Sequence, residues 1–167
     1  DKNFTERLFP EMLQPKTIVK NINGFYYLRG KPIAKEEALS ICNNLSDAVI
    51  KQAMETSQGK SVIRFSSSDG MTTCKGLSVQ KLFDLYKKNY IVQEVRQHAI
   101  LSKLNPTSLN TVRLTTFRRE EDVVVLTSLL RMGRKDALVD NVSVGGVFCE
   151  ISPDGRLKAP AYSIKPT

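Results

Sequence analysis

Residues 109–131, LNTVRLTTFRREEDVVVLTSLLR, hold two runs rich in β-branched and apolar residues on either side of a polar turn. Side chains alternate between the two faces of a strand, and β-branched residues favour strands. We therefore predict strands over residues 109–117 and 123–131, with the polar turn at residues 119–122. The short connection makes an antiparallel hairpin the natural pairing of the two strands.

The register of this hairpin decides whether Arg113 and Arg131 share a face. If odd positions pair with odd positions, both guanidinium groups point to the same side of the sheet, whereas a slip of one residue separates them. Two guanidinium groups among threonines favour an anion-binding surface such as a phosphate site. An exposed sheet face with solvated arginines is the alternative, and the pattern alone leaves both open.

Outside the hairpin, the chain alternates short strands and helices, and the turn Asn23-Gly24 is a strong hairpin signal. Asn3, with Glu6 three residues later, predicts the cap of a first helix. Further helices are expected over residues 35–45, 78–88 and 97–104, and further strands within residues 17–28 and over residues 47–52, 61–65, 90–95 and 145–151. The expected fold class is α+β, with mostly antiparallel sheets and helices packed on them.

Composition limits the class of protein. The chain has 167 residues with 25 Lys and Arg against 17 Asp and Glu, a formal net charge of +8 that favours a polyanionic partner. No apolar run approaches the roughly 18 residues that a membrane helix needs. The odd count of 3 cysteines argues against a disulfide framework and favours a cytoplasmic location. A single histidine, His98, excludes metal sites with several histidines.

Lys51 stands at the end of an apolar strand, where burial of its charge is costly unless an anion pairs with it. The loop that follows includes Gln58, Gly59, Lys60 and Ser61. A strand, a small-residue loop and a strand form a flap that is able to fold over phosphates, although the Walker A pattern GxxxxGK[ST] is not matched. Lys2 supplies a further cation near the first helix.

A second segment, residues 139–146, combines oxygen ligands with glycine. Asp140 and Asn141 carry the oxygen atoms that Mg²⁺ accepts. The pair Gly145-Gly146 lets backbone approach a ligand closely and aim N–H groups at phosphate. An Asp-Asn turn followed by a β-bulge is the alternative interpretation.

The order of these features resembles the ATP-grasp superfamily: Asp1-Lys2, Lys51, the loop around Gly59, the strand at residues 91–94 and the arginine-bearing hairpin. Three motifs look more narrowly like the sugar-transfer-associated ATP-grasp family. They are LNPTSLNTVR at residues 104–113, LRMG at residues 130–133 and VDNVSVGG at residues 139–146. The resemblance covers nearly the whole chain.

The resemblance implies two small lobes with ATP between them and a role for each matched residue. Lys2 and Lys51 would contact the ATP phosphates, and Gln58, Gly59, Lys60 and Ser61 would form the loop that closes over them. Gln93, Glu94 and Val95 match the hinge strand whose backbone hydrogen-bonds the adenine edge. Arg113 and Arg131, as catalytic residues, would face the γ-phosphate, with Asn141, Gly145 and Gly146 on the phosphate and acceptor side.

The chemistry implied is that of a ligase, with ATP and Mg²⁺ as cofactors. ATP phosphorylates a small-molecule carboxylate or a sugar-linked acceptor, and an amine or thiol attacks the acylphosphate. The family label points to sugar transfer and cell-surface polysaccharide biosynthesis. The usual Glu-x-Asn metal motif does not occur, since Glu150 is followed by Ile151 and Ser152. Asp140 is therefore the candidate ligand in this chain, and the main metal ligands are expected beyond Thr167.

The resemblance also divides the chain. Residues 1–45 would lead into the core, residues 46–95 would form the ATP-binding lobe with the glycine loop and hinge strand, and residues 96–167 would form a truncated second lobe. Two alternatives stay open: a catalytically idle scaffold domain, and a basic RNA-binding module. The RNA-binding surface would use Lys87, Lys88, Arg118, Arg119, Arg131 and Arg134. Nucleic acid is not the favoured partner, because the aromatic residues do not alternate with the basic ones as a stacking platform requires.

Overall fold

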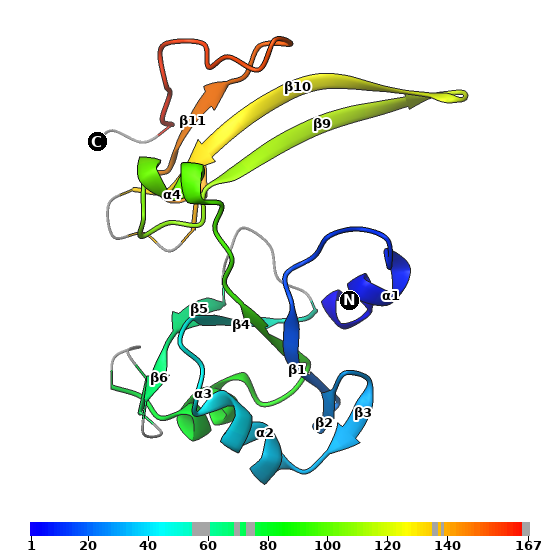
Figure 1. Cartoon of the computed structure of the whole chain (residues 1–167), viewed down its shortest axis with the longest axis vertical. Helices are drawn as coiled ribbons and strands as arrows, with labels where there is room; N and C mark the ends of the chain where they lie inside the picture. Colours follow the sequence, from blue (N-terminus) through cyan, green and yellow to red (C-terminus); the bar gives the residue numbers. More distant parts are fainter. Residues whose placement is uncertain (55–60, 69–70, 73–75, 135–136, 138, 165–167) are drawn as a thin grey trace. The chain divides into compact units, whose positions relative to one another are not determined.

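The structure is a computed structural model that describes residues 1–54, 61–68, 71–72, 76–134, 137 and 139–164 (Figure 1). It divides into two compact units, Asp1–Arg96 and Gln97–Thr167. The predicted fold class is confirmed, because both units combine antiparallel sheets with a few short helices. Among the described residues, no helix has the length and apolar character needed to cross a membrane.

The first unit is built on a six-stranded sheet with the strand order β3-β2-β1-β8-β4-β5. Its strands are β1 (Thr17–Ile22), β2 (Phe25–Leu28), β3 (Lys31–Ile33), β4 (Ala48–Gln52), β5 (Val62–Phe65) and β8 (Tyr90–Glu94). Each strand runs antiparallel to its neighbours. The segments 1–45 and 46–95 therefore both contribute strands to one sheet.

The hairpin of β1 and β2 turns at Asn23 and Gly24, as predicted. Both residues have positive φ, 51° and 95°, which the favoured two-residue hairpin turn requires. Strand β3 is not expected from the sequence pattern, because it is three residues long and contains Pro32. Proline is tolerated there because β3 is an edge strand.

Two helices, α2 (Lys35–Cys42) and α3 (Val79–Tyr86), pack against one face of this sheet (Figure 1). The buried core between them consists of Ile18, Val19, Ala38, Cys42, Ala48, Ile50, Phe65, Val79, Leu82, Phe83, Tyr86, Tyr90 and Val92. The predicted cap of α3 is confirmed, since Ser78 Oγ accepts the Lys81 N–H at 3.2 Å. Helix α2 ends three residues before the expected Leu45, where Asn43 and Asn44 interrupt a run of better helix formers. A two-stranded ribbon of β6 (Ser67–Ser68) and β7 (Met71–Thr72) completes the unit.

The N-terminal segment forms a 3-10 turn, η1 (Lys2–Phe4), followed by the short helix α1 (Thr5–Leu8). The prediction that Asn3 caps this helix is wrong. Phe4 occupies the N-cap position of α1, and Asp1 caps the preceding turn η1, because its carboxylate accepts the Asn3 N–H at 2.9 Å. Asn3 is instead buried and donates to the Asn21 carbonyl at 3.5 Å, while the Lys2 N–H bonds the Ala53 carbonyl at 2.9 Å and fixes η1 beside the end of β4.

The second unit contains a three-stranded sheet with the order β11-β10-β9. Its elements are α4 (Ala99–Leu104), β9 (Thr111–Arg119), β10 (Asp122–Met132), η2 (Val142–Val144) and β11 (Val147–Glu150). The predicted hairpin is confirmed as the long ribbon of β9 and β10, with β11 beside β10 (Figure 1). Helix α4 starts where His98 Nδ1 accepts the Ile100 N–H at 3.3 Å.

The register of β9 and β10 changes along the ribbon. Near the base, Thr111 lies opposite Arg131 and Arg113 lies opposite Leu129, so odd positions pair with odd positions. A shift between Val125 and Thr127 then places Val125 opposite Thr116. One extra residue in β10 is a bulge, which leaves the base of the hairpin in the predicted register.

Candidate functional site

The face of the first sheet that lies away from α2 and α3 carries a row of side chains around Lys51. Ala48 and Ile50 of β4 belong to the core, so alternation along the strand directs Lys51 to the opposite face. Lys51 lies opposite Ile91 of β8, and Ile91 in turn lies opposite Lys20 of β1. Lys2 approaches the end of β4, with its Nζ donating to the Gln52 carbonyl at 2.8 Å.

Lys2 and Lys51 form a pair of interacting cations. Burial lowers the pKa of Lys51, and the charge of Lys2 lowers it further. Burial likewise lowers the pKa of Lys2. Lys51 forms no ion pair with any residue that the structure describes. An anion placed against it would stabilise the charged amine, so this face is chemically suited to bind one.

Lys20, in the same row, differs because it has a carboxylate partner. Its Nζ lies 2.8 Å from Glu6 Oε2 and donates to the Asn3 carbonyl at 2.9 Å. Burial alone would raise the pKa of Glu6, but hydrogen bonds from Lys20 and Thr17 outweigh it and lower the pKa. Unlike Lys20, Lys51 has no carboxylate partner within the part of the chain that the structure describes.

The predicted hinge residues lie at the end of β8. The Glu94 N–H donates to the Lys16 carbonyl at 3.0 Å and the Val95 N–H donates to the Asp47 carbonyl at 3.2 Å. These two donors are therefore already engaged within the chain. Gln93 is buried, and its Nε2 donates to Thr17 Oγ1 at 2.9 Å, whereas its Oε1 has no hydrogen-bond partner among the described residues. The adenine-binding role of these residues stays a prediction.

The predicted phosphate loop falls largely outside the described residues, which omit Gln58, Gly59 and Lys60. Ser61 is described and exposed. It has a positive φ of 63°, and its carbonyl accepts the Tyr86 hydroxyl at 2.8 Å. This bond ties the start of β5 to helix α3.

In the second unit, Arg113 and Arg131 point to the same face of the hairpin, as odd-to-odd pairing requires. Arg131 Nη2 lies 3.4 Å from Asp140 Oδ1 and donates to the Asp140 carbonyl at 3.3 Å. Thr111 Oγ1 bonds the other carboxylate oxygen of Asp140. Arg113 is exposed and has no carboxylate partner among the described side chains. One guanidinium is thus neutralised and the other is accessible to an anion.

The segment after Asp140 is a tight turn. Asn141 Oδ1 accepts the Ser143 N–H at 3.0 Å and the Ser143 hydroxyl at 2.9 Å. The Gly145 N–H donates to Val142 at 3.1 Å and the Gly146 N–H donates to Asn141 at 3.0 Å. Both glycine N–H groups therefore form hydrogen bonds within the segment, as the alternative interpretation of a turn requires.

Both glycines are required by this turn. Gly145 has a φ of 95°, in the left-handed region that side chains disfavour. A Cβ at Gly146 would lie 2.9 Å from the carbonyl oxygens of Met132, Asp140 and Asn141.

The motif LNPTSLNTVR contains a polar cluster that we did not anticipate from its sequence. Asn105 Nδ2 donates to the Gly133 carbonyl at 2.8 Å, and Ser108 Oγ accepts the Gly133 N–H at 2.9 Å. Asn110 Nδ2 donates to the carbonyls of Leu101 and Asn105 at 2.8 and 2.9 Å. The sequence signal for this cluster is the pair of asparagines, Asn105 and Asn110, on either side of Pro106. Asparagine side chains commonly form hydrogen bonds with nearby backbone groups in turns.

The described residues contain no group of three or more His, Cys, Asp or Glu side chains that could hold a metal ion. Asp140, the predicted ligand, is held by Arg131 and Thr111. The donor set on these residues therefore does not fit Mg²⁺.

The α+β fold with mostly antiparallel sheets is that of an ATP-grasp-type protein. More narrowly, the chain belongs to the sugar-transfer associated ATP-grasp family, whose model matches residues 1–166. This confirms the resemblance carried by the three motifs. No curated protein and no solved structure matches the chain.

Proposed function

We propose that this chain binds ATP, with Lys2 and Lys51 contacting the phosphates. The main support for this proposal is that Lys51 is a half-buried cation without a carboxylate partner among the residues described. Its charge is disfavoured by burial and by Lys2, so the free protein keeps two lysines in an arrangement that costs stability. A triphosphate supplies the negative charge that relieves both effects.

The reaction that we propose is the activation of a carboxylate in an ATP-dependent ligase linked to sugar transfer or polysaccharide synthesis. ATP phosphorylates the carboxylate, and attack by an amine or thiol on the acylphosphate releases phosphate. Of the two predicted arginines in the second unit, Arg113 has no carboxylate partner among the described residues, and it is suited to balance charge on a transferred phosphoryl group. Arg131 has a supporting role, because Asp140 already neutralises it.

Mg²⁺ accompanies ATP in the family, and we propose that it arrives with the nucleotide. Because Asp140 is paired with Arg131, we assign none of the described residues as a direct ligand of the ion. The two free cysteines described, Cys42 and Cys149, are buried, in keeping with the reducing cytoplasm as the proposed compartment.

Thermal unfolding of the folded chain with and without ATP tests the proposal. Saturation at 100 times the dissociation constant stabilises a protein by about 2.7 kcal/mol, which a melting scan resolves. Lys51→Met keeps the aliphatic stem and removes the charge, so ATP should no longer stabilise this variant. Lys31→Ala, at an exposed lysine of β3, is the matched control and should respond like the parent. Absence of any shift for the parent chain would remove the support for ATP binding.

A further inference from the structure

Strand β9 forms an open edge of the second unit's sheet. The strand order β11-β10-β9 gives β9 one strand neighbour, and among the described residues of this unit no strand pairs with its outer side. All nine residues of β9 are exposed. The opposite edge differs, because Tyr162 bridges to Phe148 of β11 and covers it. A long exposed edge is a ready template for another strand.

The two faces of β9 have different chemistry. One face carries Arg113, Phe117 and Arg119 with two threonines, and the other begins with Val112 and Leu114. Three arginines and no acidic residue lie within the strand. The acidic residues of the hairpin follow at Glu120, Glu121 and Asp122, and Asp122 lies opposite Arg119.

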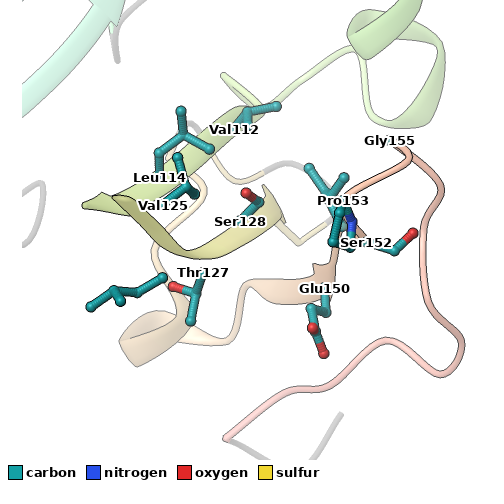
Figure 2. A pocket seen from close by; sticks show the side chains of 11 residues that line it. Val112, Leu114, Val125, Thr127, Ser128, Glu150, Ser152, Pro153 and Gly155 are labelled. Carbon is teal, nitrogen blue, oxygen red and sulfur yellow. The ribbon is translucent and has the colours of Figure 1, made fainter. Parts of the chain in front are cut away.

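The apolar face of β9 continues into a cavity of about 490 Å³. Val112, Leu114 and Val125 line it from the hairpin, and Ile151 and Pro153 line it from the segment after β11. Figure 2 shows Val112 and Leu114 on the ribbon and Pro153 on that later segment. Val112, Leu114 and Val125 are each about half exposed, at 50%, 54% and 52%. The cavity is therefore a site where apolar side chains of an added strand would be buried.

We propose that β9 is a docking strand for an extended segment of another protein, with acidic residues on one face and apolar residues on the other. Main-chain hydrogen bonds along the edge would supply affinity, and alternate side chains would supply specificity. The acidic side chains would lie beside Arg113 and Arg119, while the apolar ones would lie over Val112 and Leu114 and reach toward the cavity. The edge shares Arg113 with the proposed phosphoryl-transfer site, so the test relies on Arg119, which the proposed function does not use.

A second copy of the chain is a poorer occupant for the same edge. Pairing β9 with itself would gather the three arginines of each copy along one ladder, without an acidic residue of either strand to neutralise them. Like charges on neighbouring strands are destabilising. An acidic partner removes this repulsion, so charge favours a different chain.

The test uses a synthetic peptide as long as β9, with alternating valine and glutamate, and measures its binding to the folded chain by fluorescence anisotropy. We expect binding to this peptide and a loss of about tenfold or more when lysine replaces glutamate. Two further peptides carry backbone N-methyl groups at alternate residues. In the first peptide the methyl groups block the N–H groups of one edge of the strand, and in the second they block those of the other edge. One should lose binding and the other should keep it, because only one edge of the added strand pairs with β9.

Protein variants complete the test. Arg119→Glu should weaken binding of the glutamate peptide and improve binding of the lysine peptide, whereas Lys103→Glu, the same charge change on α4, should alter neither. Equal binding of the lysine and glutamate peptides to the parent chain would overturn the proposal, and so would indifference to both N-methyl patterns. The proposal would also be overturned if the chain bound no peptide but self-associated, and Arg119→Glu changed that self-association. This result would assign the edge to a second copy of the chain.

Discussion

Removal of the Ser108 hydroxyl is a direct test of the polar cluster that joins the motif LNPTSLNTVR to Gly133. Ser108 is 1% exposed, and its Oγ accepts the Gly133 N–H at 2.9 Å. Ser108→Ala leaves that buried N–H without a partner, because the adjoining Asn105 amide bonds the Gly133 carbonyl and not its N–H. An unsatisfied buried donor costs about 1–3 kcal/mol. The variant should lose that much unfolding free energy.

The assay is urea unfolding followed by far-ultraviolet circular dichroism, since the chain contains no tryptophan. Ser102→Ala is the control. The Ser102 hydroxyl donates to the Ala99 carbonyl one helical turn earlier, and its loss in α4 should change stability by about 0.5 kcal/mol or less. A Ser108→Ala variant no less stable than Ser102→Ala would refute the structural role of this cluster.

Three further predictions concern acid stability, thiol reactivity and the glycine turn. Hydrogen bonds from Lys20 and Thr17 lower the pKa of Glu6 against the opposing effect of burial. The contribution of Glu6 to stability is therefore present above its unfolded pKa and is lost as pH falls through its folded pKa. Glu6→Gln should flatten the acid limb of a curve of stability against pH, and an unchanged limb would contradict the pairing with Lys20. Burial raises the pKa of Cys42 to about 12, so peptide mapping after iodoacetamide treatment should find Cys42 alkylated only in unfolded protein; native alkylation at neutral pH would refute its burial. Gly146→Ala should destabilise the chain by about 1–3 kcal/mol in urea unfolding, because its Cβ would crowd three carbonyl oxygens, and a neutral result would contradict the close turn.

Alternation of side chains predicted the hairpin well at its base and poorly near its tip. Threonine and apolar residues alternate around Arg113, so one register gathers the apolar side chains Val112 and Leu114 on one face. Residues 123–126 are four apolar residues in succession, and such a run does not specify which side chain faces which way. The register shift before Thr127 was therefore not predictable from the pattern.

Local signals failed where a distant residue competed for the same group. Asn3 and Glu6 have the spacing of a capping box, but the Glu6 carboxylate pairs with Lys20, which lies 14 residues away along the chain. Asp1 caps the preceding turn η1, and Phe4 occupies the N-cap position of α1. The contacts that decide between these arrangements form only when β1 and the N-terminal segment pack together.

The candidate site was predictable in part. An apolar strand that ends in lysine suffices to predict that burial disfavours the charge of Lys51, and burial does lower its pKa; its binding of an anion stays a prediction. The approach of Lys2 to the end of β4 depends on η1, and was expected only from the family resemblance. Gly145 and Gly146 suit both a phosphate nest and a tight turn, and only the structure shows that their N–H groups are engaged within the segment.

The most direct test of the central claim is the proton uptake that accompanies ATP binding, measured by isothermal titration calorimetry in buffers of different ionisation enthalpy. Burial and Lys2 lower the pKa of Lys51 in the free protein, and a bound phosphate should raise it again. In the alkaline range where the free amine is partly deprotonated, binding should therefore take up protons. Lys51→Met should lose this uptake together with most of the affinity. Equal affinity and equal uptake in parent and variant would contradict the assignment of Lys51 as a phosphate-binding residue.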